Sequence, residues 1–249
     1  MAGHSQFKNI MYRKGAQDAK RAKVFTKLIR ELTVASKEGG ADPSANPRLR
    51  SAISAAKSGN LPKDTMEKAI NRGTNSGVGS NFESVRYEGY APGGVAFIVD
   101  ALTDNRNRTA GEVRAAFVKY GGTLGETNSV AFQFDRVGSI RVKTSEKDSD
   151  KMFELAIELG AEEVIDTEEY YEFITTQENF YNLRNSLETK ISDDISAELI
   201  WKPKNLIKVD NETAEKVLKI FETLEESDDV QTVSSNFDIS DETLNKLRG

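Results

Sequence analysis

Residues 3–37, GHSQFKNIMYRKGAQDAKRAKVFTKLIRELTVASK, decide how this chain is organised. Between Met1 and Arg30 there are eight basic side chains and one acidic side chain. From about Ala16 onward, apolar residues recur every three or four positions, as they do along one face of a helix, and Gly39-Gly40 is a typical helix end. The apolar face holds Phe25, Leu28, Ile29, Leu32 and Ala35, and the opposite face holds Lys20, Lys23, Lys27, Arg30 and Lys37.

A helix of this kind can pack one side and present a row of cations to a polyanion. The alternative is that the cations are only a solvated surface, although solvated faces usually mix their signs. Two further helices are predicted, one from the cap residue Asn46 and Pro47 to Gly59, and one from Leu61-Pro62 to Gly73. The pattern does not distinguish a helix-turn-helix from an ordinary three-helix bundle.

The net charge of −6 is unevenly distributed along the 249 residues. Residues 1–80 hold 15 basic and 6 acidic residues, a net charge of +9, whereas residues 81–249 hold 19 and 34, a net charge of −15. A basic head is therefore joined to an acidic body. The small, polar stretch TNSGVGSN at 74–81 is the predicted flexible linker between them.

After the linker, apolar residues recur at every second position, which is the spacing of a β-strand. Residues 82–90 and 95–103 predict a β-hairpin with its turn at 91–94. A helix is then expected to open at Thr109, which forms a capping-box pattern with Glu112, and a strand is expected over residues 130–134.

Residues 137–202 predict the order βαββαβ, which is the ferredoxin-like arrangement and is complete in itself. The ββαβ pattern before it lacks a helix and a strand, and the segment after residue 204 supplies both. We therefore predict an α+β protein with an N-terminal three-helix domain and two ferredoxin-like α/β sandwich domains, one inserted in the other. The expected domains are 1–80, a discontinuous middle domain of 81–135 and 204–249, and an inserted acidic domain of 136–203.

The composition gives little support to catalysis. The chain has no cysteine, and His4 is its one histidine. No zincin or nucleophile-elbow motif is present, and adjacent acids on an acidic surface do not define a catalytic pair. The longest apolar run, around residues 95–99, is too short to span a bilayer. We expect no enzyme activity, metal, cofactor, small-molecule substrate or membrane association.

The candidate nucleic-acid-binding residues are the cations of the head and of the loop at 103–109. If about five to eight of them contact phosphate, log K should fall against log salt with a slope near −4 to −7. Phe7 and Tyr12 are either base-stacking residues or core aromatics. In the loop, Arg106 and Arg108 suit a phosphate or a carboxylate at a helix N-terminus, and the alternative is that this loop only caps the helix. The head candidates are Lys8, Arg13, Lys14, Lys20, Arg21, Lys23, Lys27, Arg30, Arg48, Arg50, Lys57, Lys63, Lys68 and Arg72.

The sequence resembles the YebC/PmpR family along its whole length. The motifs that carry the resemblance are MAGHS at 1–5, GGADP at 39–43, NLPKD at 60–64, YEGYAPGGV at 87–95, LTDNRNRT at 102–109 and GGTLG at 121–125. The resemblance implies three domains and a non-enzymatic cytoplasmic protein that regulates transcription by binding DNA. Relatives also include a mitochondrial translational activator and bacterial proteins linked to stalled ribosomes.

We therefore expect a nucleic-acid-binding regulator of gene expression, a DNA-binding transcriptional regulator first and a ribosome- or rRNA-associated translation factor as the alternative. A monomer is favoured. Lysines without an evident base-reading set favour RNA, and the family favours DNA. We also expect that changing Lys20, Lys23 and Lys27 to Glu abolishes binding and leaves the fold intact.

Overall fold

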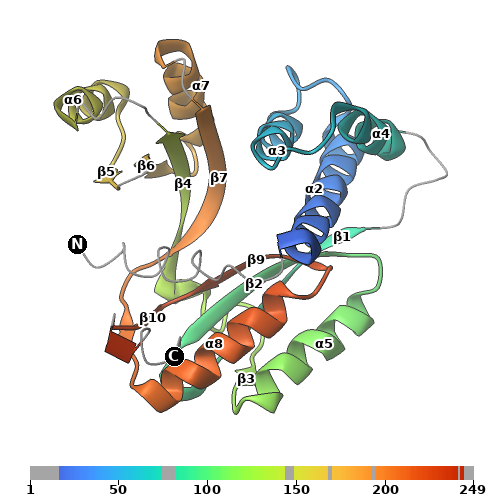
Figure 1. Ribbon diagram of the computed structural model, residues 1–249, viewed down its shortest axis with the longest axis vertical. Coiled ribbons are helices and arrows are strands. Elements are labelled where there is room, and N and C mark those ends of the chain that lie inside the picture. The colour runs from blue at the N-terminus through green and yellow to red at the C-terminus, as the bar shows by residue number, and fades with distance from the viewer. Residues whose placement is uncertain are drawn as a thin grey trace. The chain divides into compact units, whose positions relative to one another are not determined.

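The protein is described by a computed structural model (Figure 1) that covers residues 17–74, 82–143, 149–167, 170–191, 194–240 and 242–243, without the side chains of 17–21 and 194. Its contacts divide the chain into two compact units. The first unit comprises residues 1–27, 80–135 and 203–249, and the second comprises residues 28–79 and 136–202. The predicted linker lies outside the described residues from position 75 onward.

The three predicted helices of the head are present as α2 (Gln17–Gly39), α3 (Pro47–Ser58) and α4 (Lys63–Thr74). Gly40 follows α2 with φ +83°, the left-handed conformation that ends helices and favours glycine. The Asn46 side chain caps α3 by accepting from the Leu49 N–H, as its sequence position predicted. The second unit buries Leu32, Leu49 and Met66, one from each helix.

Helices α2 and α4 approach each other closely at Gly73. A Cβ there would lie 2.3 Å from the carbonyl oxygen of Thr33, so only glycine fits. The Thr33 and Ser36 hydroxyls donate to the α4 carbonyls of Ala69 and Ile70 at 3.2 and 2.8 Å. Gly73, the residue before the last residue of α4, therefore sets the spacing of this pair.

The first unit contains a four-stranded antiparallel sheet of order β3-β1-β2-β9. Helices α5 and α8 lie side by side against one face of it (Figure 1). Phe97, at the centre, contacts the Phe117 ring edge-on at a centroid distance of 5.7 Å and is fully buried. The elements are β1 (Glu83–Tyr90), β2 (Ala96–Thr103), α5 (Arg106–Lys119), β3 (Thr123–Leu124), α8 (Asn211–Glu225) and β9 (Val230–Ser235), with the short parallel pair β8 (Ile207–Lys208) and β10 (Phe237–Asp238).

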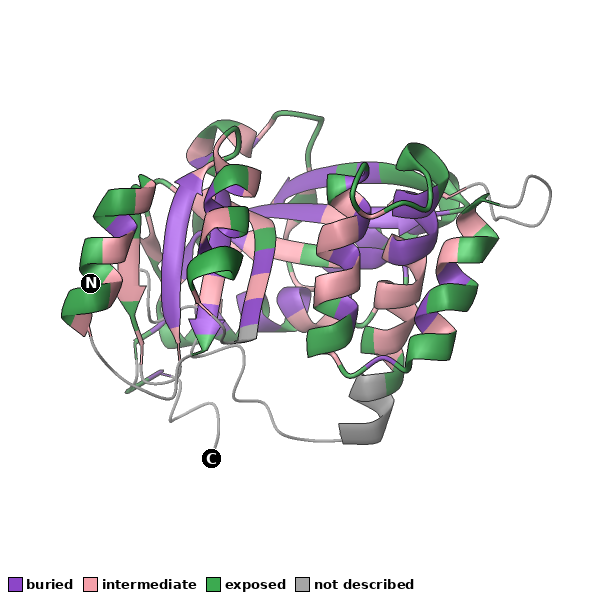
Figure 2. Cartoon of the chain, turned by 90° about the horizontal axis from the view of Figure 1, so that it is seen from above, coloured by how far each residue is buried: buried purple, intermediate pink, exposed green. Residues whose placement is uncertain are grey.

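The second sheet has the order β5-β6-β4-β7, the order of a ferredoxin-like βαββαβ unit. Helices α6 and α7 pack against one face of this sheet. Ile140 and Phe173 are fully buried in the core that the helices and strands share. Figure 2 shows the buried residues concentrated along the strands, while the helices carry their exposed residues outward. The elements are β4 (Phe134–Lys143), α6 (Ser149–Leu159), β5 (Glu163–Asp166), β6 (Tyr171–Thr176), α7 (Phe180–Lys190) and β7 (Asp194–Pro203).

The predicted fold class is confirmed: an α+β chain with helices first and one α/β sandwich inserted in the sequence of another. Two local predictions are wrong. Helix α5 begins at Arg106, because Asn105 accepts from the Arg108 N–H and caps it, so Thr109 lies inside the helix. Residues 131–133 form a 3-10 turn, and one long strand, β4, starts at Phe134.

Candidate nucleic-acid interface

The first predicted binding residues along the chain lie outside the part that the structure describes in full. Lys8, Arg13 and Lys14, together with the aromatic candidates Phe7 and Tyr12, lie outside the described residues. Lys20 and Arg21 lie in the first turns of α2, where the backbone alone is described. Their roles stay predictions.

Lys23 and Lys27 contact the end of helix α8. The Lys23 Nζ donates to the carbonyl oxygen of Glu226 at 3.0 Å, and the Lys27 Nζ donates to that of Glu225 at 3.0 Å. Burial lowers the pKa of Lys27, while the nearby charge of Glu225 opposes that shift. Both lysines are half-buried. They stabilise a helix C-terminus, where orphan carbonyls and the helix dipole favour cations.

Arg48 is held by two carboxylates. Its Nε and Nη2 donate to the two Glu31 oxygens at 2.7 and 3.0 Å, and its Nη1 donates to Glu38 at 2.5 Å. The hydrogen bonds to Glu31 raise the pKa of Arg48. A bidentate pair of this kind fixes α3 against α2 rather than leaving the guanidinium for an external phosphate.

Arg50 is also engaged, because it donates to the carbonyl oxygens of Pro43 and Ser44 at 3.0 Å each and to Asn185 at 3.3 Å. Arg30 is half-buried and has an interaction of its own. Among the head arginines whose side chains the structure describes, Arg30, Arg48 and Arg50 therefore interact within the protein, although an arginine can make bidentate contacts with bases.

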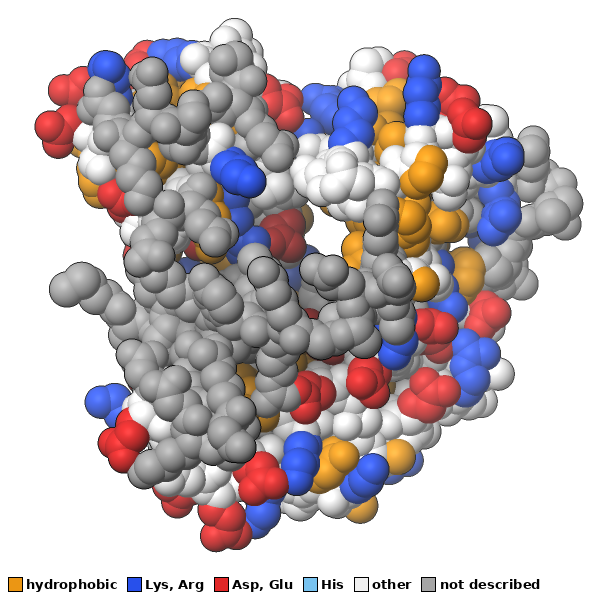
Figure 3. All heavy atoms as spheres, viewed as in Figure 1, with side chains coloured by type: hydrophobic (Ala, Val, Ile, Leu, Met, Phe, Trp, Pro, Cys, Tyr) orange, Lys and Arg blue, Asp and Glu red, His pale blue; other side chains and the backbone are white. Residues whose placement is uncertain are grey.

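The remaining head cations are exposed to solvent. Lys37, Lys57, Lys68 and Arg72 form no hydrogen bond or ion pair with another described residue. Lys63 makes one loose contact, 3.8 Å from Glu67, and 83% of its side chain is exposed. Lys68 and Arg72 are four residues apart on α4 and thus share a face. In Figure 3 the described Lys and Arg side chains lie in small groups interspersed with acidic ones.

The loop at 103–109 is organised around a buried carboxylate that the sequence did not indicate. Asp229 is 3% exposed and accepts from the hydroxyls of Thr103 and Thr109 at 3.2 and 2.7 Å. Arg108 donates to the same Asp229 oxygen at 2.7 Å and to Asp104 at 2.9 Å. Both carboxylates raise the pKa of Arg108, the Asp229 hydrogen bond most.

The capping explanation of this loop thus accounts for most of its polar residues. Arg106 differs from Arg108, because its side chain is exposed and has no hydrogen bond or ion pair to another residue in the described part of the chain. If the loop binds an anion, Arg106 is the residue available to do so.

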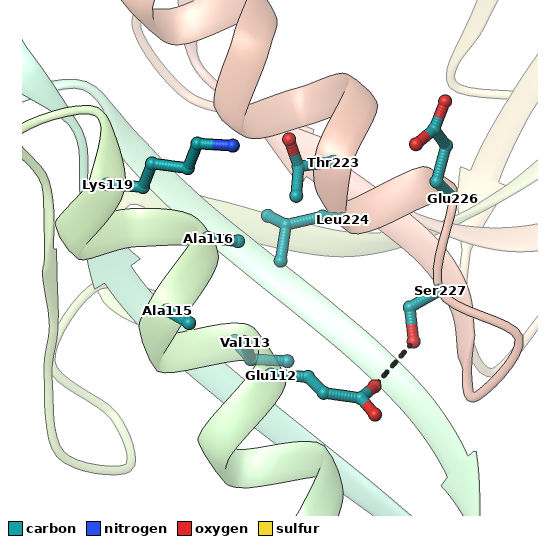
Figure 4. Close-up of a pocket in the computed structure, with 9 residues that line it drawn as sticks. All are labelled: Glu112, Val113, Ala115, Ala116, Lys119, Thr223, Leu224, Glu226 and Ser227. Atoms are coloured by element: carbon teal, nitrogen blue, oxygen red, sulfur yellow. Dashed lines mark hydrogen bonds between the residues drawn. The ribbon is translucent and has the colours of Figure 1, made fainter.

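A shallow groove of about 360 Å³ runs between α5 and α8. Figure 4 shows Ala116 and Leu224 between the two helices, Lys119 and Glu112 on the α5 side, and Ser227 turned toward Glu112. The groove offers no histidine or cysteine, and over the described ranges no group of three potential metal ligands occurs. No described helix is long and apolar enough to cross a membrane.

Comparison with known proteins identifies the family. A model of the TACO1/YebC N-terminal domain matches residues 5–76, and a model of the second and third TACO1/YebC domains matches residues 82–237. The chain belongs to the TACO1/YebC family. The resemblance inferred from the sequence motifs is thereby confirmed. The second model is that of a transcriptional regulator, so TACO1/YebC is a regulatory family and not an enzyme family.

A solved crystal structure has the same fold. It is a conserved hypothetical protein from Aquifex aeolicus, with 47% sequence identity and a TM-score of 0.84. The alignment covers 93% of this chain and 96% of the Aquifex protein.

Proposed function

We propose that this TACO1/YebC protein is a non-enzymatic regulator of gene expression that binds nucleic acid through its N-terminal basic segment and the exposed cations of α2 to α4. The observation that carries the proposal is the exposure of Lys37, Lys57, Lys68 and Arg72 without carboxylate partners among the described residues. Surface cations of this kind neutralise phosphates and release counterions.

DNA-bound transcriptional regulation is the first candidate, because the family model is that of a transcriptional regulator. A second candidate, an RNA-bound translation factor associated with the ribosome, is favoured by a separate observation. Arg48 and Arg50 are engaged within the protein, and the exposed cations are mostly lysines. Lysines bind phosphate as point charges and do not read base sequence, which fits an RNA-bound factor better than a sequence-specific DNA regulator.

A matched pair of double variants tests the interface. We expect Lys68→Gln/Arg72→Gln to weaken binding to duplex DNA or RNA and to make the salt slope shallower by about 0.9 for each lost phosphate contact on B-DNA. The control is Lys216→Gln/Lys219→Gln on α8, where both lysines are paired with Glu212 and Glu215. It removes the same charge, so an equal loss in the control would show that only net charge matters.

Two cellular measurements separate DNA from RNA. Sedimentation of extract at low and high salt, with nuclease controls, shows whether the protein travels with ribosomes, and footprinting shows whether it protects promoters. Promoter protection without co-sedimentation excludes the translational role. The reverse result excludes the transcriptional role.

A further inference from the structure

The C-terminus of helix α8 carries charges of the wrong sign for a helix end. Its last turn contains Glu222 and Glu225 and no basic residue, the cap residue is Glu226, and Asp228 follows. Peptide dipoles place a partial negative charge at this end of a helix, so nearby carboxylates destabilise it and cations stabilise it.

The cations that this terminus lacks come from α2. Lys23 and Lys27 are one turn apart and reach the last two carbonyl oxygens of the α8 end, both at 3.0 Å. Lys27 is held close to the charges of Glu225 and Asp228. A half-buried ammonium needs such partners, since desolvation of an uncompensated charge is costly.

We propose that the acidic C-terminus of α8 is an internal competitor of nucleic acid for Lys23 and Lys27. This inference rests on the proposed function, because competition matters only if the basic head (residues 1–80) binds a polyanion. While the two lysines contact α8, their donors point to its carbonyl groups, and an incoming phosphate meets the like charges of Glu225 and Asp228. Nucleic acid gains the full basic face of α2 only when this contact opens.

Because of this contact, a charge reversal at Lys23 and Lys27 can weaken nucleic-acid binding for two different reasons. Changing Lys23 and Lys27 to Glu places new carboxylates beside Glu225 and Asp228 as well as removing phosphate contacts. Loss of binding in such a variant therefore does not separate the two effects. Neutralising the α8 side separates them, because the lysines stay in place.

The test compares Glu225→Gln/Asp228→Asn with Glu212→Gln/Glu215→Gln in the full chain. Both variants remove two negative charges, but Glu212 and Glu215 lie on the exposed side of α8 and pair with Lys216 and Lys219. We expect the first variant to bind a labelled DNA or RNA fragment about three- to thirtyfold more tightly than wild type at low salt, from the usual effect of charges at a helix end. The control should gain less, and the difference should shrink as salt rises.

Hydrogen exchange without nucleic acid provides a second readout. Amides of residues 22–27 should exchange faster in Glu225→Gln/Asp228→Asn than in wild type or the control, because the contact that holds this part of α2 is weakened. Equal affinities for all three proteins, or unchanged exchange at 22–27, would overturn the competition. Absence of binding by all three would refute the proposed function, and the competition with it.

Discussion

Replacing Asp229 with Ala should cost about 3 kcal/mol of the free energy of unfolding without weakening nucleic-acid binding. The Asp229 carboxylate accepts from the buried hydroxyls of Thr103 and Thr109 at 3.2 and 2.7 Å. Hydrogen bonds to a charged group contribute about 1.5–3 kcal/mol each, and two that share an acceptor are not fully additive. The Arg108 guanidinium is solvent-exposed, so its bond to Asp229 adds little.

The assay is thermal and urea unfolding followed by circular dichroism. For a chain of this size, about 3 kcal/mol corresponds to a decrease in Tm of roughly 6–12 °C. Hydrogen exchange shows where the stability is lost. The amides to follow are that of Leu102, which donates to the Asp229 carbonyl at 2.8 Å, and that of Arg108. Asp104→Ala, which removes the exposed partner of Arg108, is the control and should change stability by less than about 1 kcal/mol.

Two results would refute the structural explanation of the 103–109 loop. One is a stable Asp229→Ala protein with unchanged exchange at Leu102 and Arg108. The other is a normally folded variant with much weaker nucleic-acid binding, which would show that Asp229 orients Arg108 for an anion.

Three further predictions follow from buried or capping side chains. Arg48→Gln should lower stability by about 1–2 kcal/mol, since Glu31 loses a bidentate partner, and should leave affinity for nucleic acid unchanged in a binding titration; a weakened affinity at full stability would make Arg48 a binding residue. Glu88 is 1% exposed and accepts from three backbone N–H groups of the segment 128–131, so Glu88→Gln, with one acceptor oxygen fewer, should cost about 2–3 kcal/mol in urea unfolding; a neutral result would contradict the role of Glu88 in fixing that segment. The pKa of Asp210 is lowered from 3.8, first because the backbone N–H of Thr213 donates to the carboxylate and second because the Thr213 hydroxyl does. The stability that the charged carboxylate contributes is therefore present above the unfolded-state pKa and is lost as pH falls through the folded-state pKa. The Tm advantage of wild type over Asp210→Asn should therefore shrink below about pH 4, and a pH-independent difference would show that the charge is not involved.

Much of the fold could be predicted because local signals agreed with the tertiary structure. Asn46-Pro47 predicted a helix start and Gly39-Gly40 a helix end, and the structure has both there. The βαββαβ order of elements predicted the strand order of the second sheet. The start of α5 was missed because Thr109 and Glu112 fit a capping-box pattern in the sequence. In the structure Asn105 caps the helix, and the Thr109 hydroxyl donates to the distant Asp229.

The candidate site was less predictable, because sequence shows which residues are charged but not which are paired. Arg48 and Arg108 look alike as surface cations in sequence, yet carboxylates up to 121 residues away hold them in place. One signal was available for the Lys23 and Lys27 contact. Helix α8 ends in Glu222, Glu225 and Glu226 without a cation, and such an end predicts that cations come from elsewhere.

The salt dependence of nucleic-acid binding by the full-length protein tests the central claim most directly. Fluorescence anisotropy with a labelled DNA duplex and a labelled RNA, from low to high salt, gives the slope of log K against log salt. Five to eight phosphate contacts predict a slope between about −4 and −7 for B-DNA. A slope near zero, or no binding to either polymer at low salt, would contradict the account.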